Sequence, residues 1–346
     1  MRIVEVGHMV DLVNMIGLEA VLAGIADYIE QDFRRWPEFD KSPRYASHSR
    51  DGVIELMPAA DADNFAFKYV NGHPANFRTG LQTVIGFGVL ADTATGYPRM
   101  IAEMTILTAL RTAATSALAA RYLARKDCRS MALIGLGAQS EFQAVAFGAQ
   151  LGIRRLQVHD TDPAAAAKFL RNMAGRDFDI EIARSAPEAL HGVDIVTTVT
   201  ADKRRATILS DNMIGSGLHI NAVGGDCPGK TELQPEILSR ASVFVEHAPQ
   251  TRIEGEVQQM PADFPVTELW QVIAGTAQGR SSRDEITLFD SVGFAVEDFA
   301  ALRYIADHSE DPRFHRTVDL LARPEDTRDL FGLLNPAAAR LDRQAA

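Results

Sequence analysis

The chain has little cysteine and no long apolar run, and these shortages exclude several classes of protein. Only two cysteines, Cys128 and Cys227, occur among 346 residues, so we expect neither a disulfide framework nor a cysteine-based zinc site. No uninterrupted apolar stretch approaches the ~20 residues that span a bilayer. Glu5 and Asp11 interrupt the N-terminal segment, which argues against a signal peptide. We therefore expect a cytoplasmic protein without a membrane partner.

Positive charge is also in short supply. The chain has 35 lysines and arginines against 46 aspartates and glutamates, which gives a net charge of −11. A surface with this balance repels phosphate backbones, so nucleic acid is not expected as a partner. An anionic ligand would need a local cluster of cations. The histidines His48, His73 and His219 show no metal-ligand spacing, and we predict no metal site.

The pattern of apolar residues predicts an α/β protein with two domains. The first forty or so residues have helical periodicity, whereas residues 52–104 contain short β-branched and aromatic runs separated by turns, which indicates a largely antiparallel sheet. Residues 106–125 are rich in alanine and leucine and lack glycine and proline, which favours a long helix. From residue 130 to about 307 strands alternate with helices, as in a parallel, doubly wound sheet.

A glycine turn lies within the strand–turn–helix predicted for residues 131–150. Gly135 and Gly137 allow the backbone to turn tightly and approach a pyrophosphate at the N-terminus of the next helix. Ser140 stands where the G-x-G-x-x-G fingerprint has its third glycine. Asp160 ends the next predicted strand, where an acid can bind ribose hydroxyls and repel a 2′-phosphate. The pattern favours NAD over NADP, the alternative being a glycine turn that binds no nucleotide.

Two further loops follow predicted strands of the same sheet. Residues 198–203 form the first, and residues 221–233 form the second, which presents Asp226 and then Lys230. Ligands bind beside the carboxyl ends of strands in doubly wound sheets. Both loops are candidate ligand contacts, although an aspartate beside glycines also suits an ordinary turn.

Four charged residues in the N-terminal part are candidates for a ligand site. Glu55 and Lys68 lie in apolar strands, where a single charge is usually solvated at the surface. Arg111 lies in the alanine-rich helix, and a half-buried guanidinium requires a carboxylate or phosphate partner. Arg44 precedes the sheet. The residues alone leave a solvated and a functional interpretation open.

Several long segments, taken together, resemble the ornithine cyclodeaminase/mu-crystallin family. They include GVIELMP, FKYVNGHPAN, MALIGLGAQSEFQA, NAVGGDCPGKTEL and PQTRIEGE, and the resemblance extends from the N-terminus to about residue 305. It implies a Rossmann-type doubly wound NAD-binding domain over residues 113–312. This domain would be inserted into an α+β substrate-binding and dimerisation domain, formed by residues 1–112 together with 313–346. The resemblance also implies a homodimer that pairs through the N-terminal sheets.

The resemblance also implies roles for individual residues. The cations that hold the substrate carboxylate fall on Arg44, Lys68 and Arg111. The acids around the substrate amino groups fall on Glu55 and Asp226, which are expected to be catalytic. The predicted cofactor contacts are Thr83, Arg111, Gly135, Gly137, Ala138, Gln139, Asp160, Thr161, Thr200, Ala201, Asp202, Lys230 and Ser291.

The reaction implied by the family is the conversion of ornithine to proline and ammonia, with NAD consumed and regenerated. A second cationic amine on the substrate needs a carboxylate partner, and this suits the pair Glu55 and Asp226. The alternatives within the family are a cyclodeaminase for lysine, a ketimine reductase and an NAD-dependent amino-acid dehydrogenase. A binding protein without turnover is a further alternative, but the two acids and three cations favour an enzyme.

Overall fold

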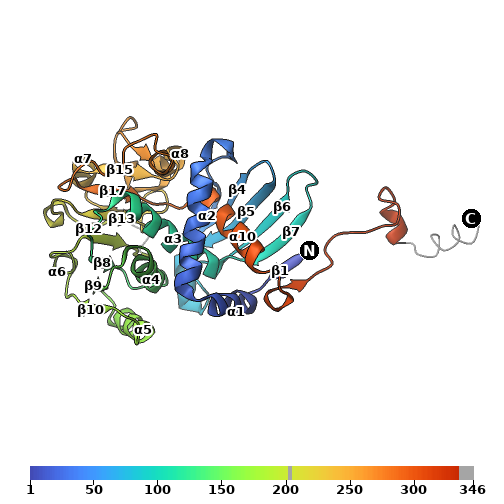
Figure 1. Ribbon diagram of the computed structural model, residues 1–346, viewed down its shortest axis with the longest axis horizontal. Coiled ribbons are helices and arrows are strands. Elements are labelled where there is room, and N and C mark those ends of the chain that lie inside the picture. Colours follow the sequence, from blue (N-terminus) through green and yellow to red (C-terminus); the bar gives the residue numbers. More distant parts are fainter. Residues whose placement is uncertain (202–204, 335–346) are drawn as a thin grey trace, which may run out of the picture.

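The computed structural model describes residues 1–201 and 205–334, which form two layered halves (Figure 1). The N-terminal half is built on an eight-stranded sheet of order β18-β1-β7-β6-β5-β4-β2, with β3 paired to β4. Its strands are β1 (Arg2–Val4), β2 (Asp40–Lys41), β3 (Tyr45–His48), β4 (Val53–Ala60), β5 (Asn64–Gly72), β6 (Gly86–Asp92), β7 (Pro98–Glu103) and β18 (Arg316–Thr317). The strands from β2 to β7 pair antiparallel, which confirms the sheet predicted for residues 52–104.

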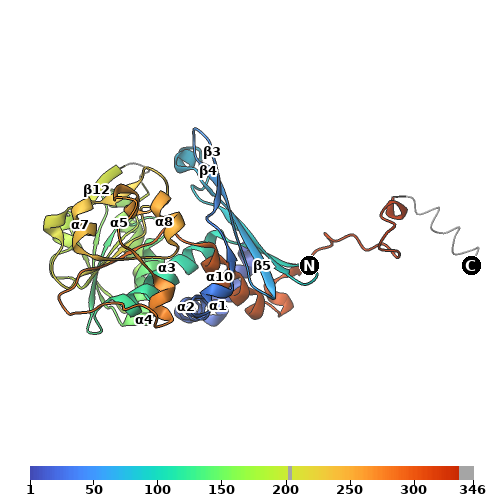
Figure 2. The same cartoon turned by 90° about the horizontal axis from the view of Figure 1, so that it is seen from above.

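One face of this sheet is covered and the other is open. The helices α1 (Val6–Ile16), α2 (Leu18–Arg34) and α10 (Ala295–His308) lie between the sheet and the other half of the molecule (Figure 2). Side chains alternate along each strand because the pleat points successive Cβ atoms to opposite faces. In β4, Glu55 and Met57 are therefore buried, while Ile54 and Leu56 are each 40% exposed.

The second half contains the predicted parallel sheet, of order β10-β9-β8-β11-β13-β17-β15-β16. Its strands are β8 (Ser130–Ile134), β9 (Arg155–His159), β10 (Asp179–Ile182), β11 (Ile195–Thr198), β13 (His219–Ala222), β15 (Ser242–Val245), β16 (Thr267–Glu268) and β17 (Thr287–Asp290). The connecting helices are α4 (Ser140–Leu151), α5 (Pro163–Met173), α6 (Ala186–Ala189), α7 (Pro235–Arg240), α8 (Ala248–Glu254) and α9 (Leu269–Ile273). All pairs in the sheet are parallel, so the expected α/β class with a Rossmann-type arrangement is confirmed.

A small additional sheet was not predicted. It pairs β12 (Arg205–Leu209) with β14 (Thr231–Leu233) in parallel. The second strand belongs to the segment 221–233, which the sequence suggested only as a loop. Its Thr-Glu-Leu sequence is too short to show a periodic pattern.

The long helix α3 (Thr105–Leu123) joins the two halves and agrees with the helix predicted for residues 106–125. It packs against α2 on one side and α4 on the other. Because neighbours cover it all round, residues 110–120 are all buried, and small alanine side chains let the neighbouring helices approach closely. The alanine-rich composition thus reflects tight packing as well as helix propensity.

The last helix packs with the N-terminal half. α10 contacts α2 and the strands β4, β5 and β6. The expected domain limit at residue 312 grouped this helix with the parallel sheet, whereas its apolar side chains pack on the N-terminal sheet. After α10, β18 pairs with β1 and the chain extends away from both halves (Figure 1).

Within residues 1–201 and 205–334, no single helix is long and apolar enough to cross a membrane. Only taken together would α1 and α2 have the length and apolar composition of a membrane span, and a bend of 100° separates the two helices.

Candidate active site

The three predicted substrate cations lie together in the interior. Arg44 precedes β3, Lys68 lies on β5 and Arg111 lies on α3. Their side chains are 7%, 1% and 7% exposed. Buried cations need carboxylate partners because transfer from water is costly for an isolated charge. Such partners surround this cluster, so the solvated interpretation of Lys68 is wrong.

Arg44 is held by groups from three parts of the chain. Its Nη1 donates to Oε2 of Glu55 at 3.1 Å, and its Nε lies 3.2 Å from Oε2 of Glu254. Its Nη2 donates to the carbonyl oxygens of Val292 and Gly293, both at 2.7 Å. Arg44 therefore ties β4 to α8 and to the loop after β17. Glu254 was not among the predicted site residues.

Lys68 and Arg111 share an acidic partner from α10. The Nζ of Lys68 lies 2.9 Å from Oδ1 and 2.8 Å from Oδ2 of Asp298. The Nε of Arg111 lies 2.9 Å from the same Oδ1, and its Nη1 donates to Glu297 at 2.7 Å. Burial raises the pKa of Glu297 to about 8, although the Arg111 guanidinium opposes this shift.

Sequence reasoning missed these two acids. The pattern of residues 295–307 indicates only one more helix of the region in which strands and helices alternate. The signal for a buried charge site that the sequence offers is a pair of adjacent acids at the start of an otherwise apolar helix. In the structure, Asp298 shares its face of that helix with buried apolar residues. Two charges on such a face need buried partners.

Gly293 lets the loop after β17 pass close to Arg111. Its φ is +74°, a conformation that suits glycine. A Cβ atom at this position would lie 2.5 Å from Nη1 of Arg111. The glycine therefore allows the carbonyl contact with Arg44 and the position of Arg111 at the same time.

The central loop brings Asp226 and Lys230 to the same edge of the parallel sheet. Asp226 is about half exposed, and its Oδ1 lies 3.4 Å from Nζ of Lys230. Lys230 also donates to the carbonyl oxygen of Thr200 at 2.9 Å. Burial raises the pKa of Glu254 to about 7, Arg44 opposes the shift, and the carboxylates of Glu55 and Asp226 increase it. The two predicted catalytic acids therefore both lie within electrostatic range of Glu254.

Buried carboxylates fix the loops at this edge. Glu256 accepts hydrogen bonds from the backbone N–H groups of Glu232 and Leu233, and Asp290 accepts from those of Glu256 and Val257. Burial raises the pKa of Glu256 to about 7. Each acid satisfies two consecutive backbone donors, so the loops are held by bonds that the primary sequence does not reveal.

Glu232 and Glu246 complete this support. The hydroxyl of Thr200 donates to Oε1 of Glu232, whose carboxylate fills the space where a Cβ of Gly224 would otherwise lie. The hydroxyl of Ser291 donates to Glu246 at 2.6 Å. Thr200 and Ser291, both predicted cofactor contacts, are thereby oriented by acids that the sequence did not identify.

The glycine turn has the geometry of a nucleotide cradle. Gly135 has φ +97°, and a Cβ there would lie 2.9 Å from the backbone at Val199. A Cβ at Gly137 would meet nothing within 4 Å, so space is open in front of the turn. Ser140 donates to the carbonyl oxygen of Gly137 at 2.8 Å. The hydroxyl therefore closes the turn in place of a third glycine.

Asp160 and Gln139 lie beside this turn. Asp160 accepts from the backbone N–H groups of Leu136 at 2.6 Å and Asp162 at 2.8 Å. The buried Oε1 of Gln139 has no hydrogen-bond partner among the described residues. A buried acceptor without a donor is costly, so a bound polar ligand would satisfy it.

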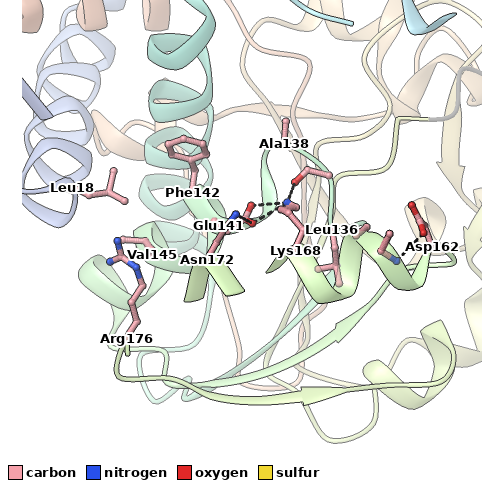
Figure 3. Close-up of a pocket in the computed structure, with 13 residues that line it drawn as sticks. Leu18, Leu136, Ala138, Glu141, Phe142, Val145, Asp162, Lys168, Asn172 and Arg176 are labelled. Atoms are coloured by element: carbon pink, nitrogen blue, oxygen red, sulfur yellow. Dashed lines mark hydrogen bonds and ion pairs between the residues drawn. The ribbon is translucent and has the colours of Figure 1, made fainter. Parts of the chain in front are cut away.

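A cavity of about 700 Å³ lies behind the turn, between α4 and α5 (Figure 3). Its polar side chains bond one another: Lys168 lies 2.9 Å from Glu141 and donates to the carbonyl oxygen of Gly137, and Asn172 donates to Glu141. Asp160 and the three buried cations are not among its lining residues. We interpret this network as support that fastens the turn to α5.

The remaining predicted cofactor residues have fewer contacts. Thr161 and Ala201 are exposed, and Ala138 lies in the glycine turn. The carbonyl oxygen of Thr83 accepts a hydrogen bond from the backbone N–H of His73 in the loop between β5 and β6. Asp202 lies outside the described residues.

The chain is similar to known proteins both in sequence and in fold. A sequence profile of the ornithine cyclodeaminase/mu-crystallin family matches residues 6–312. The chain is 61% identical over 331 residues to the ornithine cyclodeaminase of Brucella suis biovar 1 (strain 1330), with 96% of this chain and 92% of that protein covered.

Two solved structures are similar over almost the whole chain. One is a lysine cyclodeaminase whose structure concerns the recognition of L-lysine, L-ornithine and L-2,4-diaminobutyric acid. Its TM-score is 0.89 at 33% identity, and the match covers 96% of this chain and 98% of that one. An archaeal alanine dehydrogenase dimer with bound NAD has a TM-score of 0.85 at 29% identity, covering 93% and 99%.

We predict that Gly293→Ala destabilises the protein more than an alanine at another glycine of positive φ. Gly275 has φ +76° and open space around it, so Gly275→Ala adds only backbone strain of about 1–2 kcal/mol. Gly293→Ala must also displace Arg111 from its buried partners, which adds a further ~1–3 kcal/mol. Urea unfolding of both variants measures the difference, and equal losses would contradict the close packing against Arg111.

Proposed function

The chain belongs to the ornithine cyclodeaminase/mu-crystallin family, and we propose that it is an ornithine cyclodeaminase that converts L-ornithine to L-proline and ammonia with NAD as the redox cofactor. The observation that carries this proposal is the single buried cluster of Arg44, Lys68 and Arg111, with Glu55 and Asp226 beside it. Cations for one carboxylate and acids for two amines match a diamino acid. The 61% identity to an ornithine cyclodeaminase supports the same substrate.

NAD fits the residues at the edge of the parallel sheet. The open space before Gly137 and the N-terminus of α4 suit a pyrophosphate. The buried Oε1 of Gln139 can accept a bond from the cofactor, and Asp160 directly follows β9, where the adenosine ribose is expected. When bound, NAD would accept a hydride from Cα of ornithine and return it to the same carbon after ring closure, so no net NADH would form.

The substrate carboxylate is proposed to bind Lys68 and Arg111, with Arg44 beside them. Nη2 of Arg111 makes no hydrogen bond to another described residue, so it can donate to a carboxylate. Arg44 already contacts Glu55 and Glu254 and two backbone carbonyls. We therefore propose that Arg44 contributes more to holding Glu55 and Glu254 in place than to binding the substrate carboxylate.

Asp226 is proposed as the general base for ring closure. It is about half exposed at the mouth of the site and can take a proton from the side-chain ammonium of ornithine. The freed amine forms a bond to the oxidised α-carbon, and the α-nitrogen leaves that carbon as ammonia. Glu55 is fixed by Arg44 and would exchange protons with the leaving nitrogen. Ring closure is fast because both reacting groups belong to one bound molecule.

We also propose that the protein forms a homodimer through the open face of the N-terminal sheet. This face exposes Ile54, Leu56, Phe65 and Phe87, each 39–42% exposed, and Phe87 stacks on Tyr69 with ring centroids 5.1 Å apart. A contiguous apolar sheet face of this kind is typical of a protein interface.

We also propose a division of the chain into two domains and a cytoplasmic location. We propose that the cofactor domain lies between the end of α3 and the start of α10, because α10 packs on the N-terminal sheet. A cytoplasmic location is consistent with the two cysteines, which form no disulfide.

The stoichiometry of the reaction tests the proposed function. With L-ornithine and a trace of NAD, we expect one proline and one ammonia for each ornithine consumed, and no accumulation of NADH. Amino-acid analysis, an ammonia assay and absorbance at the nicotinamide band measure these together. NADH produced in proportion to product would indicate a dehydrogenase, and faster turnover of L-lysine than of L-ornithine would indicate a lysine cyclodeaminase.

Asp226→Asn should lower kcat by about 10²–10⁴-fold, because the amide cannot accept the proton from the ammonium. NADH binding, followed by fluorescence, should change little. Asp177→Asn is the matched control, since Asp177 is 97% exposed and lies just before the amino end of β10, whereas Asp226 follows the carboxyl end of β13. Full ammonia release by Asp226→Asn would refute the assignment of the base.

Phe87→Glu should convert the dimer to a monomer, because it places a charge on the apolar sheet face. Leu170→Glu is the control, since Leu170 is 40% exposed on α5 in the other half. Sedimentation equilibrium measures the masses. A dimer that survives Phe87→Glu, or a monomeric parent protein, would exclude this interface.

A further inference from the structure

One buried carboxylate contacts two of the proposed substrate cations. Asp298 is 1% exposed, and its Oδ1 lies 2.9 Å from Nζ of Lys68 and 2.9 Å from Nε of Arg111. The three residues come from α10, β5 and α3. Asp298 is therefore the point at which a sheet strand, a joining helix and the last helix are held together.

Asp298 lies close to the N-terminus of α10. It lies in the first turn of a 14-residue helix, where the free N–H groups and the helix dipole stabilise negative charge. The neighbouring Glu297 is bound to Nη1 of Arg111. The two adjacent acids thus hold different atoms of the guanidinium and fix its plane.

The contacts with Asp298 leave other donors of the two cations available. Arg111 uses Nε and Nη1 for its acids, and Nη2 makes no hydrogen bond to a described residue. The ammonium of Lys68 carries three N–H groups, and among the described residues it bonds only to Asp298. A carboxylate that met Nη2 of Arg111 and Nζ of Lys68 would complete a ring of alternating charges.

We infer that Asp298 is a positioning residue for the proposed substrate site: it holds Lys68 charged and aligned with Arg111 so that the two together bind the α-carboxylate of the amino acid. This inference rests on the proposed function. Asp298 does not touch the reacting atoms, and its effect is exerted through the two cations.

Charged groups face Lys68 from the elements packed around β5. Asp298 comes from α10, Arg111 from α3 and Arg44 from the segment before β3, and Arg44 is itself bound by Glu55 of β4. Burial and then Arg111 lower the pKa of Lys68 to about 8, Asp298 opposes this shift, and Arg44 adds to it. Without the carboxylate, the pKa of Lys68 would fall further, and the cation would lose its proton at a lower pH.

Asp298→Asn tests this inference in the intact enzyme. We expect KM for L-ornithine to rise at least about tenfold at pH 8, with a smaller change in kcat. The alkaline limb of the kcat/KM profile should move to lower pH by about one unit. A double variant with Lys68→Arg should remove that movement, because a guanidinium does not titrate in this range. An unmoved alkaline limb in a folded Asp298→Asn protein would overturn the inference.

Asp298→Glu separates charge from position. It keeps the negative charge but moves the carboxylate by one methylene, so KM should rise while the alkaline limb stays near its original pH. Glu297→Gln is the matched control, because Glu297 contacts Arg111 but not Lys68. If Asp298→Asn fails to fold, a KM equal to the parent value for Asp298→Glu would overturn the inference.

The titration of Lys68 provides a readout that does not require activity. The ¹³Cε resonance of Lys68, assigned with Lys68→Arg, should titrate at lower pH in Asp298→Asn than in the parent protein. If the parent protein makes no proline from ornithine, the proposed function fails, while this titration still decides whether Asp298 controls Lys68. An identical titration in both proteins would refute the inference by itself.

Discussion

The burial of three cations at the junction of the two halves is the constraint on which the site depends. A charged group taken out of water is stabilised only when opposite charges and hydrogen-bond partners replace the lost solvent. Arg44, Lys68 and Arg111 obtain those partners from β4, from the helices α8 and α10 and from the loop after β17. The same acids then fix the direction in which the cations can still donate.

The architecture follows from this requirement. α3 carries Arg111 and passes from the N-terminal sheet to the parallel sheet, while α10 returns from the parallel sheet and brings Asp298 back over β5. The loop after β17 must pass between them, and Gly293 gives it room. The proposed substrate residues and several of the proposed cofactor residues therefore lie where the chain crosses between the halves.

Much of the fold could be predicted because it depends on local patterns, whereas the roles of the charged residues came from the family resemblance. Strand and helix periods predicted the two sheets and α3, and the turn at Gly135 was recognisable from its neighbours. The pattern could not predict β14 within the Asp226 loop or the packing of α10. It also could not predict the partners of Glu254, Glu297 and Asp298, because each of these acids pairs with a residue far away in the chain.

The sequence by itself determined the α/β class, the glycine turn with Asp160, and a set of charged residues whose family resemblance names a diamino acid as substrate. Only the tertiary structure decided which carboxylate neutralises which cation and which face of the N-terminal sheet stays open. The reason is physical. Periodicity and turn chemistry act between residues close in the chain, whereas the energy of a buried charge depends on groups that only folding brings within a few ångströms.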